Sequence, residues 1–273
     1  MKKIAIIPTL LTLANAVCGF AAIAYASRIN FTQATEYYFA VSGWLIVAAM
    51  LFDVFDGYVA RLSRTASKFG GELDSLCDAV SFGLAPAFIL LKMGPGWEPR
   101  AFLHQFLAGI AALYLVCTLL RLARFNVENS PDPSAHKRFR GLPSPAAAGC
   151  IASLAIFRGT LISWSSLDSS YVLNIIEAWA TLGALAVALL MVSQVPYPHF
   201  SKKFLDPVLY RRRHFQHLIQ LVLLVFLIVT TRELALIVGF WLYAIGIPVR
   251  YAILRSLKPR AVPTPAGIEK LSK

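Results

Sequence analysis

The sequence predicts an all-α integral membrane protein, because it is rich in apolar residues and arranges them in long stretches. Of its 273 residues, 58% are hydrophobic and only 15% are charged, and the mean hydropathy is +0.64. A water-soluble domain rarely has such a composition. Crossing about 30 Å of hydrocarbon takes roughly 20 mostly apolar residues in a helix, and several stretches have that length. We therefore expect one membrane domain over residues 1–273.

About eight stretches qualify as membrane helices. They cover residues 4–27, 37–60, 73–92, 102–125, 144–161, 173–193, 215–231 and 233–253. The first stretch follows Lys2 and Lys3, as the core of a cleavable signal peptide would. However, it is longer than the usual core of about 7–15 residues, so we interpret it as a membrane helix.

The basic residues gather on one side of this expected topology. Of the 26 lysines and arginines, 21 fall at the termini or in alternate connections, including a basic tail over residues 255–273. The five on the other side are Arg28, Lys92, Arg100, Arg158 and Arg232. The positive-inside rule then places both termini in the cytoplasm, which requires an even number of helices. Because the basic residues lie between apolar spans, the net charge of +12 indicates an anionic membrane surface or substrate, and no nucleic acid.

The cysteines and histidines show no spacing typical of a metal or disulfide site. Cys18, Cys77, Cys117 and Cys150 lie singly in or beside apolar stretches, so we expect small buried side chains. The five histidines have no ligand spacing with the acidic residues. We therefore expect no chemistry from either residue type.

The acidic residues are concentrated around one connection. The chain has 14, yet Asp53, Asp56, Glu72, Asp74 and Asp78 all lie between the end of the second helix and the start of the third. Residues three or four apart share a helix face, and a short connection makes the two helices antiparallel neighbours. We expect the four aspartates to converge, where they would repel one another unless divalent cations bind. All-oxygen ligands suit Mg²⁺ or Mn²⁺, and two ions can clamp a diphosphate.

Small residues beside these aspartates would let a phosphate or nucleotide approach the backbone. Gly57 and Ala60 lie on the second helix, and Arg61 adds a fixed cation. Gly70 and Gly71 open the third helix, where an anion could meet free N–H groups. Taken singly, such glycines are more often packing or turn residues, and a solvated acidic patch is the simplest alternative for the aspartates.

Together these residues resemble the signature of the CDP-alcohol phosphotransferase family. The order is Asp53-x-x-Asp56-Gly57-x-x-Ala60-Arg61, eight residues, Gly70, three residues, Asp74, three residues and Asp78. Residues 73–87, 120–126 and 140–149 further resemble the phosphatidylserine synthase branch, and the resemblance covers residues 8–198. One departure is Pro8-Thr9, where that branch commonly has Pro-Asn, which leaves a nucleotide contact by Thr9 open.

The resemblance implies a function and a role for each residue of the signature. It implies transfer of a phosphatidyl group from CDP-diacylglycerol to L-serine, with 53–78 as the core catalytic segment of a helical bundle. Asp53, Asp56, Asp74 and Asp78 would bind two divalent ions, and Asp78 would also take the proton of the attacking hydroxyl. Gly57, Ala60, Arg61 and Gly70 would hold the CDP moiety. The resemblance further suggests a homodimer, and the asymmetry of the basic residues places the site at the cytoplasmic face of the membrane, which we expect to be a bacterial inner membrane.

The sequence does not decide the identity of the acceptor substrate. Arg121 and Arg124 at the end of the fourth helix, and Arg140 before the fifth, could bind an acceptor carboxylate or could simply be cytoplasmic flanking charges. Glycerol 3-phosphate, inositol phosphate or choline would use the same chemistry as serine. Thr12, Asn15, Asn126 and Ser144 could touch substrate or bond helix to helix. A transporter with an acidic ion path is the alternative from another class.

Overall fold

The computed structural model describes residues 6–29, 35–63, 67–93, 102–128, 141–164, 169–197 and 233–256. The described elements are helices, with the following bounds: α1 (Ile6–Ala26), α2 (Thr35–Leu62), α3 (Lys68–Asp78), the π-helical segment η1 (Ala79–Leu84), α4 (Ala85–Met93), α5 (Phe102–Glu128), α6 (Ser144–Trp164), α7 (Ser169–Val192) and α11 (Glu233–Ser256). Because α3, η1 and α4 follow one another without a break, they form one rod.

Seven described helices are long and apolar enough to cross a membrane, with the α3–η1–α4 rod as one of them. The protein is therefore a multi-pass integral membrane protein, and the all-α prediction is confirmed. The expected helix at 215–231 and nearly all of the basic tail lie outside the described residues. The expected third helix, 73–92, lies within the observed rod Lys68–Met93.

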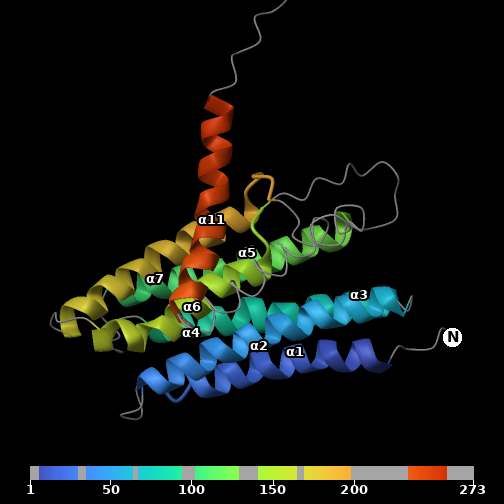
Figure 1. Cartoon of the computed structure of the whole chain (residues 1–273), viewed down its shortest axis with the longest axis horizontal. Coiled ribbons are helices and arrows are strands. Elements are labelled where there is room, and N and C mark those ends of the chain that lie inside the picture. Colours follow the sequence, from blue (N-terminus) through green and yellow to red (C-terminus); the bar gives the residue numbers. More distant parts are fainter. Residues whose placement is uncertain are drawn as a thin grey trace, which may run out of the picture.

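The helices form two groups and a crossing helix. In Figure 1, α1, α2 and the α3–α4 rod run side by side, and α5, α6 and α7 pack on them at an angle. Helix α11 crosses α6 steeply and its C-terminal half extends beyond the other helices. The buried core includes Phe39, Ile46, Phe82 and Tyr114, whereas many leucine and valine side chains on the outside are exposed. An apolar exterior is what lipid-facing helices require.

One end of this bundle gathers segments that are far apart in the sequence. Helices α2, α5 and α7 end there, and α3 and α6 begin there. Main-chain hydrogen bonds fix the entry to α6: the N–H of Gly141 donates to Val195 O over 2.9 Å, and that of Leu142 donates to Leu190 O over 3.0 Å. Gly141 has a φ of +93°, and a Cβ there would lie 2.2 Å from Met191 O, so glycine is required.

Candidate active site

Three aspartates meet where α2 ends and α3 begins. One carboxylate oxygen from each of Asp53, Asp56 and Asp74 lies within 4.8 Å of the others. The two helices are antiparallel neighbours, as the short connection predicts. Ser67 caps α3, and its hydroxyl oxygen accepts a 3.0 Å hydrogen bond from the N–H of Gly70. The Gly70 N–H therefore already has a partner, which corrects the expectation that an anion meets a free N–H there.

Asp78 lies one turn beyond Asp74, at the junction between α3 and the π-helical segment η1. Its side chain is buried and lines the same cavity as the other three aspartates. In η1 the N–H of Ala85 bonds to Val80 O, five residues back. Such π-helical turns occur often at functional sites, because they re-aim the side chains around them.

Helix α1 forms a second layer behind these carboxylates. The hydroxyl of Thr12 donates a 2.5 Å hydrogen bond to Asp56 Oδ2, and the amide of Asn15 donates a 2.9 Å hydrogen bond to Asp78 Oδ1. The hydroxyl of Ser81 donates to the main-chain oxygen of Asn15 over 2.9 Å. A Cβ on Gly19 would lie 2.4 Å from the Ser81 hydroxyl oxygen, so glycine permits this close approach of α1. Thr12 and Asn15 thus orient two of the four carboxylates.

Asn126 also makes a contact between helices. The hydroxyl of Ser75 on α3 lies 2.9 Å from Asn126 Oδ1 on α5 and donates to it. For Thr12, Asn15 and Asn126 the sequence left two interpretations open, contact with substrate or hydrogen bonding between helices. In the structure each of the three makes a hydrogen bond between helices.

The aspartate cluster fits a divalent cation. Asp74 Oδ1 is buried without a hydrogen-bond partner among the described residues, and Asp56 is only 5% exposed. A buried carboxylate oxygen without a donor is costly, and a bound cation removes that cost. The donor set is all oxygen, which suits a hard ion such as Mg²⁺ or Mn²⁺. The three residues Asp53, Asp56 and Asp74 could therefore hold a metal ion.

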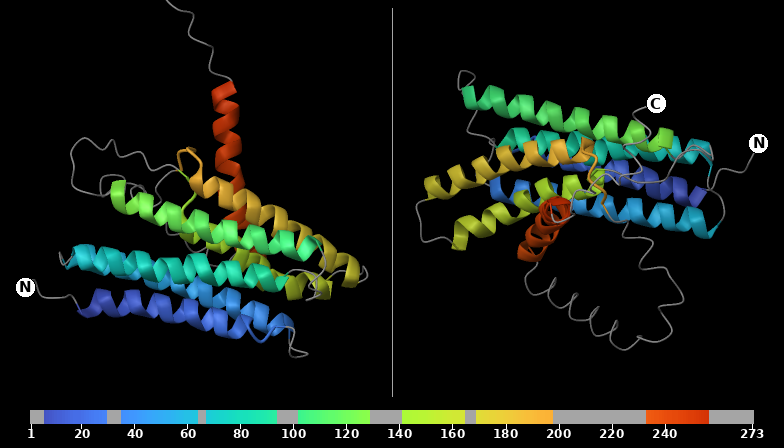
Figure 2. Two further views of the ribbon diagram at one scale, coloured as in Figure 1. Left: turned by 180° about the vertical axis from the view of Figure 1, so that it is seen from behind. Right: turned by 90° about the horizontal axis from the view of Figure 1, so that it is seen from above.

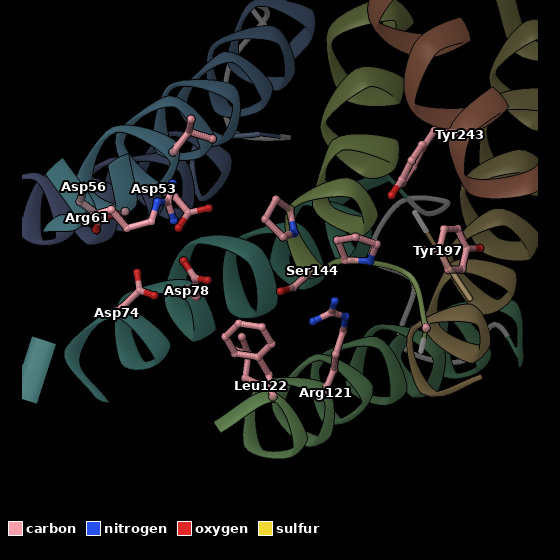
Figure 3. Close-up of a pocket in the computed structure, with 16 residues that line it drawn as sticks. Asp53, Asp56, Arg61, Asp74, Asp78, Arg121, Leu122, Ser144, Tyr197 and Tyr243 are labelled. Atoms are coloured by element: carbon pink, nitrogen blue, oxygen red, sulfur yellow. The ribbon is translucent and has the colours of Figure 1, made fainter. Parts of the chain in front are cut away.

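The aspartates line one end of a cavity of about 420 Å³. Its walls come from α2, α3, α5, the start of α6 and the residues before it, the segment that follows α7, and α11, as Figure 3 shows. The lining residues are Asp53, Val54, Asp56, Gly57, Arg61, Asp74, Asp78, Arg121, Leu122, Phe125, Gly141, Pro143, Ser144, Pro145, Tyr197 and Tyr243. A cavity of this size has room for small polar groups next to the carboxylates.

The residues that the sequence predicts for substrate binding fall into three groups. Gly57, Arg61 and Arg121 line the cavity. Ala60, Gly70 and Arg124 belong to the same helix ends but are not among its lining residues. Arg140 lies outside the described residues.

Among the polar side chains that line the cavity, the sequence reading missed two, Tyr197 and Tyr243. They lie well over one hundred residues after the aspartates and carry no motif. Only the packing of α7 and α11 around the entry to α6 brings them into the cavity. No signal in the sequence could have found them.

Comparisons with known proteins agree with this geometry. Residues 5–192 match the family described as CDP-alcohol phosphatidyltransferase. The CDP-diacylglycerol–serine O-phosphatidyltransferase of Helicobacter pylori strain J99 is 35% identical over 201 residues, which are 71% of this chain and 73% of that protein. The Bacillus subtilis protein of the same name is 30% identical over 197 residues, 72% of this chain and 92% of its own.

A yeast relative extends the comparison beyond bacteria. The Saccharomyces cerevisiae protein of that name is 37% identical over 150 residues, 53% of this chain and 51% of that protein. The family match contains all four aspartates and the helices α1 to α7 that carry or surround them. Its breadth, together with the converging carboxylates, shows that this chain belongs to the CDP-alcohol phosphatidyltransferase family.

Proposed function

We propose that the protein transfers the phosphatidyl group of CDP-diacylglycerol to L-serine, giving phosphatidylserine and CMP. The observation that carries this proposal is the convergence of Asp53, Asp56 and Asp74 within 4.8 Å in a cavity that also holds Asp78. Carboxylates this close together can bind divalent cations, and the cations can in turn bind a diphosphate. The acceptor follows from the relatives, whose shared name is CDP-diacylglycerol–serine O-phosphatidyltransferase.

We assign the four aspartates to two divalent ions, Mg²⁺ or Mn²⁺. When bound, such ions neutralise the diphosphate and lower the pKa of a nearby hydroxyl. Gly57 leaves the backbone of α2 open beside Arg61, whose guanidinium is the nearest group that a Cβ there would meet, at 3.5 Å. We assign this stretch, with Ala60 and Gly70, to the CDP moiety. Gly70 contributes small size and not its N–H, which Ser67 occupies.

Asp78 is our candidate for the general base. The serine hydroxyl oxygen attacks the phosphorus that bears the diacylglycerol, while the bond from that phosphorus to the CMP oxygen breaks and CMP leaves with the electron pair. The hydroxyl proton moves to Asp78, one of whose oxygens already accepts from Asn15. Asn15 thereby holds the carboxylate in one orientation and leaves its other oxygen for the acceptor. No covalent enzyme intermediate is needed in this single displacement.

The carboxylate of a bound serine requires a positively charged side chain beside it, and Arg121 is the best placed candidate. It lines the cavity, and its Nε donates to Leu142 O, which fixes the guanidinium. Arg124 and Arg140 remain weaker assignments, because neither is among the described lining residues. The same chemistry with glycerol 3-phosphate, inositol phosphate or choline is the second candidate. A transporter is disfavoured, because the family that matches residues 5–192 is a phosphatidyltransferase family.

The decisive experiment measures CMP release by the purified full-length protein. CDP-diacylglycerol is supplied with L-serine, glycerol 3-phosphate, inositol phosphate or choline in turn. We expect CMP release only when serine is the acceptor, and we expect a lipid product that carries an amino group. Release with another acceptor and not with serine would contradict the proposed acceptor while leaving the family chemistry intact.

We further propose that the aspartate end faces the cytoplasm of a bacterial inner membrane and that the protein is a homodimer. The topology rests on the asymmetry of the basic residues. An impermeant thiol reagent added outside intact cells should label Ser27→Cys, in the turn after α1, and should spare Ser63→Cys, in the turn after α2. The reverse pattern would invert the topology. The mass of the detergent-solubilised protein tests the dimer.

A further inference from the structure

The cavity has a second end, which the aspartates do not line. Arg121 from α5, Ser144 from α6, Tyr197 and Tyr243 stand there, as Figure 3 shows. Ser144 is buried and lies between Asp78 and Arg121 in that view. The guanidinium of Arg121 and the hydroxyl of Tyr243 both point into the space beside it. This end thus offers hydrogen-bond donors, whereas the aspartate end offers acceptors.

Tyr243 belongs to the part of α11 that is anchored most firmly. Trp241 donates through Nε1 to Cys150 O on α6 over 3.2 Å, and Ala244 is fully buried. Their neighbours Leu242 and Ile245 are 69% and 47% exposed. One face of α11 is therefore clamped against the bundle at the level of Tyr243, while the other faces outward. A clamped helix can hold a side chain in a fixed position.

A proline explains how α11 is tied to the segment that follows α7. Pro248 lies inside α11 and has no N–H, so the carbonyl of Ala244, four residues earlier, loses its helical donor. The hydroxyl of Tyr197 donates to this carbonyl over 2.9 Å. The rings of Tyr197 and Tyr243 pack with centroids 5.7 Å apart and planes inclined by 46°. Tyr197 therefore fixes both the main chain of α11 and the ring of Tyr243.

Both tyrosines lie beyond the residues shared with the family. The match ends at residue 192, and it contains the four aspartates, Arg61, Arg121 and Ser144. The shared reaction uses a CDP-linked donor, whereas the acceptor differs between members of such a family. Residues that complete the cavity from outside the shared region are therefore placed to distinguish acceptors.

We propose that Arg121, Ser144 and Tyr243 form the acceptor subsite, and that Tyr243 is the contact by which α11 selects the acceptor. This inference rests on the proposed function and deepens it. An attacking hydroxyl must approach the phosphorus from the side opposite the leaving CMP. With the nucleotide at Gly57 and Arg61, the acceptor enters from the end that holds Arg121 and Tyr243. A guanidinium and a phenol hydroxyl together match the carboxylate of a small hydroxy amino acid. Tyr197 is a positioning residue.

The test separates the two substrates kinetically. Tyr243→Phe removes one hydroxyl and keeps the ring, so the KM for serine should rise about tenfold, the scale of one hydrogen bond to a charged group. The KM for CDP-diacylglycerol should stay within about twofold, because the donor binds at the other end. Tyr197→Phe should raise the serine KM by a smaller factor, since it acts through Tyr243. Tyr251→Phe, on the exposed part of α11, is the matched control and should leave both constants unchanged.

Each outcome decides the inference. An unchanged serine KM in Tyr243→Phe, or equal rises for both substrates, would overturn it. A rise confined to serine, reproduced weakly by Tyr197→Phe and absent from Tyr251→Phe, would support it. If the wild-type protein uses another acceptor, that result contradicts the proposed function but does not by itself contradict the acceptor subsite. The subsite is then judged by the KM of the acceptor that is used.

Discussion

The two ends of the helix bundle balance their acidic side chains in different ways. Near the start of α2, Glu36 lies 3.3 Å from Arg158, whose guanidinium also lies 4.3 Å from the ring centroid of Phe39. Near its end, about 30 Å further along the helix, Asp56 and its neighbour Asp78 on α3 accept hydrogen bonds from the neutral side chains of Thr12 and Asn15. One end pairs a single carboxylate with a cation, whereas the other end sets one arginine, Arg61, and two neutral donors against four carboxylates.

This difference separates a structural pair from a binding site. A carboxylate beside an arginine is neutralised within the chain, so the Glu36–Arg158 pair needs no ligand to balance its charge. Three carboxylates within 4.8 Å carry an excess of negative charge that neutral donors orient but do not cancel. The aspartate end therefore suits the binding of cations from outside the chain, as we propose. Mutations at the two ends should change different observables.

Removal of divalent metal should have the largest effect. Excess chelator should abolish CMP release, and added Mg²⁺ or Mn²⁺ should restore it, because in the proposed mechanism the aspartates hold the ions that neutralise the diphosphate. In the absence of substrate, the metal should also raise the unfolding temperature of the wild type and not of Asp74→Asn, which lacks one ligand. Full turnover in excess chelator would contradict the assignment.

Replacement of Asp78, the proposed general base, should have the next largest effect. Asp78→Asn should lower kcat by about 10²–10⁴, the usual contribution of a general base, while CDP-diacylglycerol still binds. The stereochemistry at a chiral phosphorus gives an independent measurement. A single displacement inverts the configuration, whereas a covalent intermediate would retain it and would show that the mechanism is wrong.

A substitution in α1, which lies behind the carboxylates, should have a moderate effect on metal affinity. Thr12→Val keeps the shape of the side chain and loses the hydroxyl that donates to Asp56, so metal affinity should fall by roughly 10–100-fold. Thr12→Ser restores the donor and is the matched control. The measurement is a metal titration of CMP release and of the unfolding temperature. Equal affinities for the valine and serine variants would exclude an orienting role for Thr12.

The smallest effect on catalysis should come from the other end of the bundle. Arg158→Gln removes the cation beside Glu36 and should lower the free energy of unfolding by roughly 1–3 kcal/mol, because both partners are partly buried. The kcat of the folded protein should be nearly unchanged. Glu36→Gln in the same chain should recover part of the loss, as a double-mutant cycle would reveal. A large fall in kcat would mean that the two ends are coupled.

The sequence predicted much of the fold, because hydropathy reports the length of each helix. The expected helix 4–27 is Ile6–Ala26 in the structure, and 37–60 is Thr35–Leu62. The cysteines are free: Cys77, Cys117 and Cys150 are buried as expected, whereas Cys18 is half-buried. The start of the third helix was placed too late, because the Ser67 cap and the polar first turn of α3 carry no hydropathy signal.

The candidate site was predictable only where it is local in sequence. Spacing of three or four residues places aspartates on one helix face, and a short connection brings two such faces together. The tilt of α11 depends on packing, including Trp241 against Gly183, where a Cβ would lie 2.1 Å from the indole ring. Hydropathy contains no information on that tilt. Tyr243 therefore reaches the cavity through a geometry that residue spacing does not encode.

The π-helical segment Ala79–Leu84 makes the chain tolerant of a length change at one place. A π-helical turn holds one more residue than an α-helical turn, so deletion of one residue there lets the rod become α-helical throughout. The flanks, with Asp74 and Asp78 before it and Ala85–Met93 after it, then keep their faces toward the same neighbours. A deletion within α4 would instead rotate all later residues by about 100°. Within this segment the carbonyl of Phe82 also accepts a 2.9 Å hydrogen bond from the hydroxyl of Tyr114 on α5, which holds the π-helical turn against that helix.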